Sequence, residues 1–278
     1  MRNIRIVADS SANLTEYKGV DFSFAPMKII AGDKEFVDDI NLDANKMVEF
    51  FDSYKNRSQT SCPNFGDWIE AFGDAEEIIC VTITSGLSGS YNSACVAKDT
   101  YETEHPGRKV FVLDSLSAGP ELVLFIEKAQ ELIAEDKPFE EICSALLEYR
   151  ENTSLLFMLE SLNNFAANGR ISPAVAKITG FLGIRVVGKA SDKGQLQPLN
   201  KCRGEAKSLD TIFSHMKDMG WKNGKVRIAH CKNIGATESM SEKIRSLNPG
   251  ADIEVIPCRG LCSYYAEKGG MLIAFEKN

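Results

Sequence analysis

The sequence predicts a fold of the α/β class divided into two domains. Short apolar runs typical of strands alternate with helical patterns along the chain, and this alternation is typical of a parallel sheet covered by helices. At 278 residues, the chain exceeds the length at which a single hydrophobic core usually stops growing, so two domains are expected. The continuous apolar run that begins at residue 78 is typical of a strand covered on both faces.

The expected elements follow one another in an order that divides the chain near its middle. The expected strands cover residues 4–8, 24–30, 78–84, 110–114, 155–159, 184–188, 226–230, 253–257 and 271–276. The expected helices cover residues 44–54, 64–73, 91–103, 120–136, 139–152, 174–180, 204–219, 236–247 and 262–268. The helical stretch at 120–152 is long enough to cross between two lobes, so we expect domains at residues 1–153 and 154–278, with a second sheet starting at Leu155.

The charge and the chain start limit the class of protein. The net charge of −7, from 32 Lys and Arg against 39 Asp and Glu, is spread without long blocks. This distribution argues against nucleic acid or an anionic membrane surface as the main partner. The chain enters a strand at once, with no signal peptide and no apolar stretch long enough for a membrane span. We therefore expect a soluble, cytoplasmic protein without an integral membrane segment.

The cysteines and the known cofactor motifs predict neither a metal nor a cofactor. The eight cysteines occur without CxxC pairs, so most are expected to be small buried side chains. Cys258 and Cys262 are the only close pair and have no histidine nearby, which disfavours a zinc site. A redox role for Cys62 or Cys258 has no specific motif behind it. Neither GxGxxG nor GxxxxGK occurs, so no nucleotide cofactor is expected.

The segment at 78–94, IICVTITSGLSGSYNSA, is expected to bind an anion. Its strand leads into a loop of Ser, Thr and Gly in which Gly86 and Gly89 allow backbone N–H groups to approach a ligand. The helix that follows directs its positive end at this loop. No Lys or Arg occurs at 82–97, so a singly charged carboxylate fits better than a phosphate-rich nucleotide. The other interpretation is a capped turn in which serine side chains satisfy N–H groups.

Two further strands of the first half also end in hydroxyl-bearing residues. Parallel α/β sheets bind ligands outside the carboxyl ends of their strands, so we expect the three strand ends to line one crevice. Capping of the next helix or turn is the alternative for each of them. The crevice residues expected are Asp9, Ser10 and Ser11 after the first strand, Thr84 and Ser85 after the second, and Asp114 and Ser115 after the third, and the segment TSCPN at 60–64 adds Thr60 and Ser61 before another helix start.

A serine-type hydrolase of a lipid or other ester is the rival function. Ser88 lies between a strand and a helix, and a triad with His230 and Asp114 is conceivable. The residues around it read Gly-Leu-Ser-Gly-Ser, which departs from the GxSxG nucleophile motif at residue 90. The sequence therefore favours a binding protein over a hydrolase.

Five segments together resemble one known family. They are VADSSANL at 7–14, TSCPN at 60–64, ITSGLSGSYNSA at 83–94, VLDSLSAG at 112–119 and NGRIS at 168–172. Their order and spacing resemble the DegV family of bacterial fatty-acid-binding proteins over nearly the whole chain. The resemblance implies a two-domain fold, with a Rossmann-like parallel sheet in the N-terminal domain and a mixed sheet in the second. It also implies one long-chain fatty acid in a tunnel between the domains, presented to a separate fatty acid kinase, by a protein that is not itself the catalyst.

The resemblance also assigns roles to single residues. Thr60 and the loop with Ser85, Ser88 and Gly89 match the positions that hold the carboxylate in the family. Arg170 and Arg203 match basic positions that resemble the kinase-docking surface.

Two departures from the family pattern concern the ligand. CRGLCSYYAEKGG stands where many members have a His-containing HxGPG-like segment, so Arg259 and Gly260 are expected near the head group, where a guanidinium can replace the imidazole. TSCPN replaces the commoner TSQPS, which alters the wall beside Thr60.

An acyl chain agrees with the energetics expected for this loop. Hydrogen bonds to neutral donors contribute only about 0.5 to 1.5 kcal/mol each, whereas each buried CH₂ contributes about 0.8 kcal/mol. The shape of the tunnel should therefore set the chain preference. The residues expected to line it are Phe157, Leu159, Leu162, Phe165, Ile178, Phe181 and Leu182, for which the alternative is the core of the second domain.

Overall fold

The first half of the chain builds a parallel sheet with helices on both faces. The computed structural model describes residues 3–176 and 183–277. In it, β2 (Asp21–Ala25), β1 (Ile4–Asp9), β6 (Glu77–Thr82) and β7 (Lys109–Asp114) lie side by side in that order, and all are parallel. A short helical turn, η1 (Ser10–Ala12), follows β1 directly. The parallel sheet expected from the sequence is confirmed.

Alternate residues of β6 explain the two covered faces. Ile78 and Cys80 pack on one face against α2 (Phe65–Phe72) and α3 (Ser90–Glu104). Ile79 and Val81 pack on the other face against α4 (Pro120–Ala134) and α5 (Phe139–Glu151). Because both faces are buried, the strand is apolar throughout and shows no alternation with polar residues.

A small antiparallel sheet, in the order β4-β3-β5, corrects the expectation of one strand at 24–30. The run is divided: β2 ends at Ala25, and β3 (Lys28–Ala31) pairs with β4 (Lys34–Val37) and β5 (Ser58–Ser61). Pro26 lies between the two strands and has no N–H to donate to a ladder. The Met27 N–H donates to Ser10 Oγ, 3.1 Å away, outside any sheet. Helix α1 (Ala44–Ser53) connects β4 to β5.

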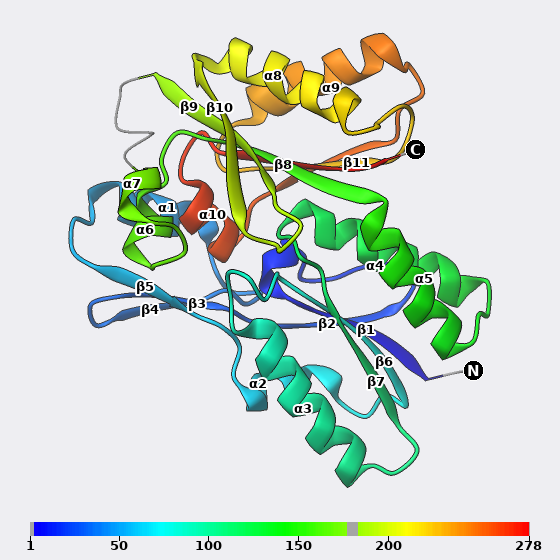
Figure 1. Cartoon of the computed structure of the whole chain (residues 1–278). Coiled ribbons are helices and arrows are strands. Elements are labelled where there is room, and N and C mark those ends of the chain that lie inside the picture. The colour runs from blue at the N-terminus through cyan, green and yellow to red at the C-terminus, as the bar shows by residue number, and fades with distance from the viewer. Residues whose placement is uncertain (1–2, 177–182, 278) are drawn as a thin grey trace.

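The second half builds a mixed six-stranded sheet, as the family resemblance implied. Its order is β10-β9-β8-β13-β11-β12, and only the β11–β12 pair is parallel. Helices α8 (Glu205–Asp218) and α9 (Ile234–Leu247) cover the face that points away from the first half (Figure 1). The strands are β8 (Thr153–Leu159), β9 (Ile184–Ala190), β10 (Leu196–Arg203), β11 (Val226–His230), β12 (Ile253–Pro257) and β13 (Met271–Glu276).

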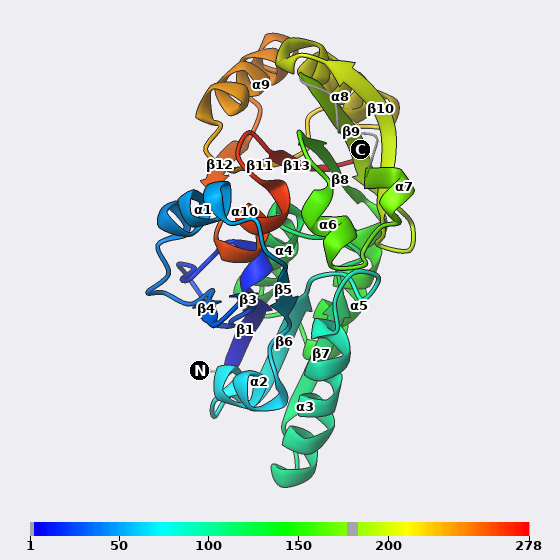
Figure 2. The same ribbon diagram turned by 90° about the vertical axis from the view of Figure 1, so that its left-hand side faces the viewer.

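The inner face of this second sheet is covered by short helices and by the first half of the chain. Helices α6 (Asn163–Ala167), α7 (Pro173–Ala176) and α10 (Gly260–Ala266) lie on this side. Figure 2 shows α10 between the six-stranded sheet and the N-terminal sheets, where it contacts α1, β3 and η1. The C-terminal part of the chain therefore returns to pack among N-terminal elements.

Helix α4 joins the two sheets. The stretch at 120–152 forms two helices, and α4 contacts β1 and β6 on one side and β8, β11 and β13 on the other, while α5 contacts β7 and β8. Phe125 belongs to the core of the first sheet, whereas Leu124 packs with Leu155 and Ala274 of the second. This position explains why α4 is apolar around most of its circumference. The domain limits 1–153 and 154–278 stay a prediction.

Candidate ligand-binding cavity

A cavity of about 300 Å³ lies between the two halves of the molecule. Its wall comes from β5, the β6–α3 loop and the β7–α4 loop on one side, and from β8, β9, α6, α10 and β13 on the other. Most of the wall is apolar, as expected for a small-molecule site. The apolar side chains are Met27, Ile83, Leu87, Leu155, Phe157, Leu159, Phe165, Leu196, Leu261 and Leu272.

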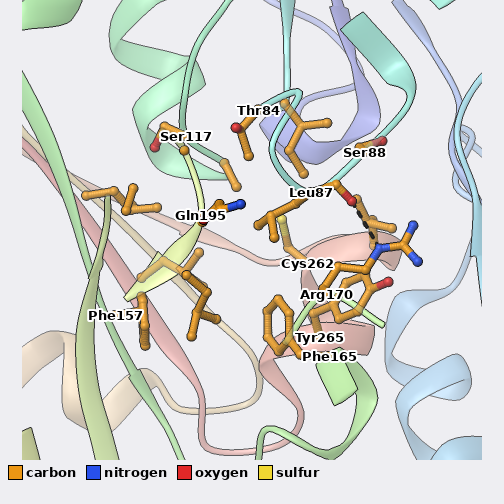
Figure 3. A pocket seen from close by; sticks show the side chains of 18 of the residues that line it. Thr84, Leu87, Ser88, Ser117, Phe157, Phe165, Arg170, Gln195, Cys262 and Tyr265 are labelled. Atoms are coloured by element: carbon orange, nitrogen blue, oxygen red, sulfur yellow. Dashed lines mark hydrogen bonds between the residues drawn. The ribbon is translucent and has the colours of Figure 1, made fainter. Parts of the chain in front are cut away.

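Polar groups lie at two places on the cavity wall: Thr84, Ser117 and Gln195 lie beside the β9–β10 turn, and a second group lies apart from them (Figure 3). Ser88, Arg170 and Tyr265 lie together there, and Phe157 lies across the cavity from them (Figure 3). Thr60 joins this group because its Oγ1 is 2.8 Å from the Tyr265 hydroxyl. Ser61, Cys62 and Gly89 complete this part of the wall. Thr60, Ser61, Ser88 and Gly89, all expected at the ligand from the sequence, are therefore on the cavity wall.

Arg170 also lies in the cavity wall, although the sequence assigned it to a partner surface. Its Nε donates to the Leu87 carbonyl at 3.0 Å, and its Nη1 donates to the Asn168 carbonyl. The first bond ties the segment after α6 to the β6–α3 loop of the other half. It also holds the guanidinium beside Ser88 (Figure 3). Arg203, the other expected partner residue, is exposed at the end of β10 and is not among the cavity residues.

The β9–β10 turn closes the cavity against the β6–α3 loop. Gly194 has a φ of +66°, and an added Cβ would collide with the Thr84 side chain. A Cβ on Gly86 would lie 2.6 Å from the Lys193 carbonyl oxygen. Only glycines permit this close approach between the two halves. Thr84 also reaches the cavity wall, but its Oγ1 accepts a hydrogen bond from the Gly86 N–H at 3.0 Å.

The three strand ends converge, but they bond mainly to one another. Asp9 accepts from the Ile83 N–H at 2.8 Å and from Ser90 Oγ at 2.6 Å, and is fully buried. Burial raises the pKa of Asp9, and hydrogen bonds from Ser11 and Ser90 oppose this shift. The carboxylate of Asp9 thus takes the donors at the start of α3 that the sequence offered to a ligand.

Ser10, Ser85 and Ser115 are consequently placed away from the cavity wall. Ser85 donates through its N–H and its Oγ to Asp114, at 3.0 and 2.5 Å. Ser115 is buried and exchanges hydrogen bonds with Ser117. Ser10 is buried and accepts from the Met27 N–H. The hydrogen bonds of these three serines are with the protein itself, as expected if they stabilise the turns after the strands and do not bind a ligand.

Arg259 and Gly260 are also placed away from the cavity. The buried Asp38 accepts from the N–H groups of Gly260 and Leu261, both at 2.9 Å, and so fills the positive end of α10. Arg259 Nε lies 3.6 Å from the Asp38 carboxylate, and Arg259 Nη2 donates to the Asp39 carbonyl. The guanidinium expected to replace the family histidine is thus paired inside the protein.

The predicted tunnel residues divide into three groups. Phe157, Leu159 and Phe165 line the cavity. Leu162 is fully buried in the core around α10 and does not line it. The remaining predicted residues, Ile178, Phe181 and Leu182, lie outside the residues that the structure describes.

Comparisons with known proteins place the chain in a family. The model of the family described as "Uncharacterised protein, DegV family" matches residues 3–278. The chain belongs to the DegV family. A DegV domain-containing protein of Streptococcus pneumoniae is 40% identical over 276 residues, which is 98% of each chain.

Two solved structures of the DegV family are very similar to this chain. One is a DegV family protein from Eubacterium eligens loaded with heptadecanoic acid, with 42% identity and a TM-score of 0.97 over 99% of this chain and 100% of that one. The other is the Streptococcus pneumoniae Fatty Acid Kinase (Fak) B3 protein loaded with linoleic acid, with 40% identity and a TM-score of 0.97 over the whole of both chains.

The hydrolase triad is not assembled in this DegV family protein. The His230 Nδ1 accepts from the Asn233 N–H at 3.1 Å, and His230 is absent from the cavity wall. The Asp114 carboxylate accepts from Ser85 and Leu116. Within residues 3–176 and 183–277, no group of three or more His, Cys, Asp or Glu side chains could hold a metal ion. In the same residues, no helix combines the length and the apolar character that a bilayer crossing requires.

Tyr265 and the β9–β10 turn are the parts of the site that the sequence analysis missed. Tyr265 lies on the cavity wall, in the segment SYYA of α10. The adjacent tyrosines in a segment already suspected of facing the ligand were an available signal. The β9–β10 turn had no signal in the sequence, because its contact with Thr84 joins residues about a hundred positions apart.

Proposed function

We propose that this chain binds one long-chain fatty acid in the cavity between its two halves and presents the carboxylate to a fatty acid kinase. The observation that carries the proposal is the asymmetry of the cavity. Most of its wall is apolar, and the hydroxyl groups of Thr60, Ser88 and Tyr265 gather with the Arg170 guanidinium at one side, apart from Thr84, Ser117 and Gln195. An apolar chain with a single acidic end matches this distribution.

The relatives support the same class of ligand. Heptadecanoic acid and linoleic acid are bound by two proteins that share the fold over their whole length at 40–42% identity. The two acids differ in length and unsaturation, so the likeness supports the class of ligand rather than one chain. The apolar side chains that line the cavity then set the chain preference.

The polar side sets the direction of the ligand. Thr60 and Ser88 offer hydroxyl donors, and Arg170 offers a positive charge to a carboxylate. These bonds contribute about 0.5 to 1.5 kcal/mol each for neutral donors, against about 0.8 kcal/mol for each buried CH₂. The acyl chain therefore dominates the affinity, and the head group fixes which end faces the loop.

The name of one relative supports a role as carrier, with catalysis left to the partner. The Streptococcus pneumoniae relative carries the name of a fatty acid kinase B protein. We assign Arg170 to the head-group side of the cavity, and Arg203, which is exposed at the end of β10, to the contact with a kinase. A cytoplasmic location stays a prediction from the sequence.

Native mass spectrometry of the protein purified from cells tests the proposal. The expected result is one bound molecule per chain, which is identified as a fatty acid after denaturing extraction. A delipidated sample should then take up one equivalent of added fatty acid. A non-lipid acid in the cavity, or no uptake of saturated and unsaturated acids, would contradict the proposal.

A further inference from the structure

Two adjacent tyrosines of α10 hold two hydroxyl groups of β5. Tyr264 forms a hydrogen bond with Ser58 Oγ at 2.7 Å, and Tyr265 forms one with Thr60 Oγ1 at 2.8 Å. Ser58 and Thr60 are two residues apart on a strand, so their side chains point to the same face. α10 and β5 are thus joined by two similar hydroxyl pairs.

The two pairs differ in what they face. Tyr265 and Thr60 line the apolar cavity, whereas Tyr264 and Ser58 line a separate, polar pocket on the other side of α10. The ring of Tyr265 packs against Phe165, with ring centroids 4.6 Å apart, and this contact fixes the position of its hydroxyl. Burial raises the pKa of Tyr265, and its bond to Thr60 opposes the shift. The phenol therefore stays neutral and keeps its proton.

The geometry leaves one hydroxyl proton of the pair for a ligand. Each hydroxyl group has a single proton, and one of the two protons is used in the bond between Thr60 and Tyr265. A phenol is a stronger donor than an aliphatic alcohol, so Tyr265 is the better donor within the pair. The Thr60 proton is then free to point into the cavity, and a chain of hydrogen bonds strengthens each of its members.

We propose that Tyr265 is a positioning residue for the ligand carboxylate, because its phenol donates to Thr60 Oγ1 and so directs the Thr60 proton at the carboxylate. This inference rests on the proposed function. Without the phenol, the Thr60 hydroxyl rotates freely and loses both its fixed direction and its polarisation. Tyr265 thereby supplies a head-group function through a position outside the serine and threonine segments.

The test compares a fatty acid with its methyl ester, which has the same acyl chain without the charge. Tyr265→Phe should weaken binding of the acid by about 2- to 10-fold, the effect of one hydrogen bond, and change binding of the ester by less than about 2-fold. Tyr264→Phe is the control, since it removes the bond to Ser58 in the other pocket, together with the bond from Asn168 Nδ2 to the Tyr264 hydroxyl at 3.0 Å. It should leave the ratio of acid to ester affinity unchanged.

Variants at Thr60 test whether Tyr265 acts through Thr60 or contacts the carboxylate itself. Thr60→Ser should keep the wild-type ratio of acid to ester affinity, and Thr60→Val should lower this ratio. In Thr60→Val, adding Tyr265→Phe should lower the ratio no further, because the phenol acts through Thr60. A further loss in that background would show that Tyr265 contacts the carboxylate directly and would overturn the inference.

Different results would contradict the role of Tyr265 and the proposed function. If wild-type protein binds the acid and Tyr265→Phe retains the same ratio of affinities, only the role of Tyr265 is contradicted. If wild-type protein binds neither the acid nor the ester, the proposed function itself is contradicted.

Discussion

At the scale of single residues, buried carboxylates decide which donors remain for a ligand. Asp9 takes the Ile83 N–H and the Ser90 hydroxyl, and Asp38 takes two N–H groups at the start of α10. The N–H groups at the start of α10 would otherwise attract an anion. The protein therefore supplies its own anions at these two places. The ligand is left with the side of the cavity around Thr60 and Arg170.

Asp38 should give the stability of the protein a distinctive pH dependence. Burial raises the pKa of Asp38 above its ordinary value of 3.8, and hydrogen bonds from Leu261 and Gly260 oppose this. A carboxyl group with a raised pKa in the folded state contributes stability below its unfolded pKa and loses that contribution as the pH rises through its folded pKa. The free energy of unfolding of wild type, relative to Asp38→Asn, should therefore decrease as the pH rises above about 4.

Urea denaturation of both proteins across this pH range checks the sign. A difference that increases with pH would mean that the N–H donors outweigh the burial of the carboxylate.

Cavity size should matter more for binding than any single head-group bond. Ala190→Phe places a ring in the cavity at the end of β9 and should abolish binding of a long-chain acid while still admitting short ones. Thr60→Ala should weaken binding by only about 2- to 10-fold, since one hydrogen bond is lost. Isothermal titration with acids of increasing length, on variants with wild-type unfolding midpoints, measures both effects. Equal and negligible effects would contradict an acyl-chain site here.

At the scale of elements, what the sequence could predict depended on burial. The central strands β1 and β6 were predicted closely because each contains a run of apolar residues, at 6–8 and 78–81. β5, with the sequence SQTS, and β10, with LQPLNKCR, were missed because they are polar and partly exposed. Thr60 was nevertheless identified through its motif, although the strand that carries it was not. A local hydrophobic pattern does not reveal a strand that is made mostly of polar residues.

The β9–β10 turn should control how tightly the cavity is closed. Gly194→Ala adds a Cβ that collides with Thr84 at a φ of +66°, so the turn should move away from the β6–α3 loop. We expect a loss of at least about 1 kcal/mol in the free energy of unfolding and faster release of bound fatty acid.

Gly204→Ala is the matched control for this turn. Gly204 has a φ of +82°, and no atom lies within 4 Å of an added Cβ. Gly204→Ala should lower the free energy of unfolding through backbone strain but leave the release rate of bound fatty acid unchanged. Stopped-flow displacement of a fluorescent fatty acid measures this rate. Equal release rates in the two variants would contradict a closing role for the turn.

At the scale of the whole molecule, a buried ion pair fixes the two sheets about α4. Arg227 on β11 donates from Nε and Nη2 to the carboxylate of Glu127 on α4, at 2.6 and 2.8 Å. Both side chains are less than 10% exposed. The cavity lies between the same two sheets, so its width depends on how firmly this connection holds. No sequence pattern pointed to the pair, because its partners are 100 residues apart.

Arg227→Met should destabilise the protein by up to about 3 to 5 kcal/mol, because it removes both guanidinium donors from the buried Glu127 carboxylate and leaves it with Lys225 Nζ, 3.3 Å away. Lys243→Met is the control, since Lys243 and Asp210 form an ion pair at 2.7 Å with both side chains at least one-third exposed. Its loss should cost less than about 1 kcal/mol. Urea denaturation measures both, and a loss in Arg227→Met no larger than in the control would contradict the importance of the buried pair.

The position of β13 has a consequence for how the protein is made. β13 (Met271–Glu276) lies between β8 and β11, although both of these precede it in the chain. During synthesis, the edges of β8 and β11 that pair with β13 therefore stay unpaired until residue 271 has left the ribosome. Unpaired edges can form sheets with other chains. Tyr265 and the rest of α10 emerge only shortly before. The cavity wall therefore lacks residues of α10 and β13 until these elements have been synthesised, and lipid loading follows their emergence.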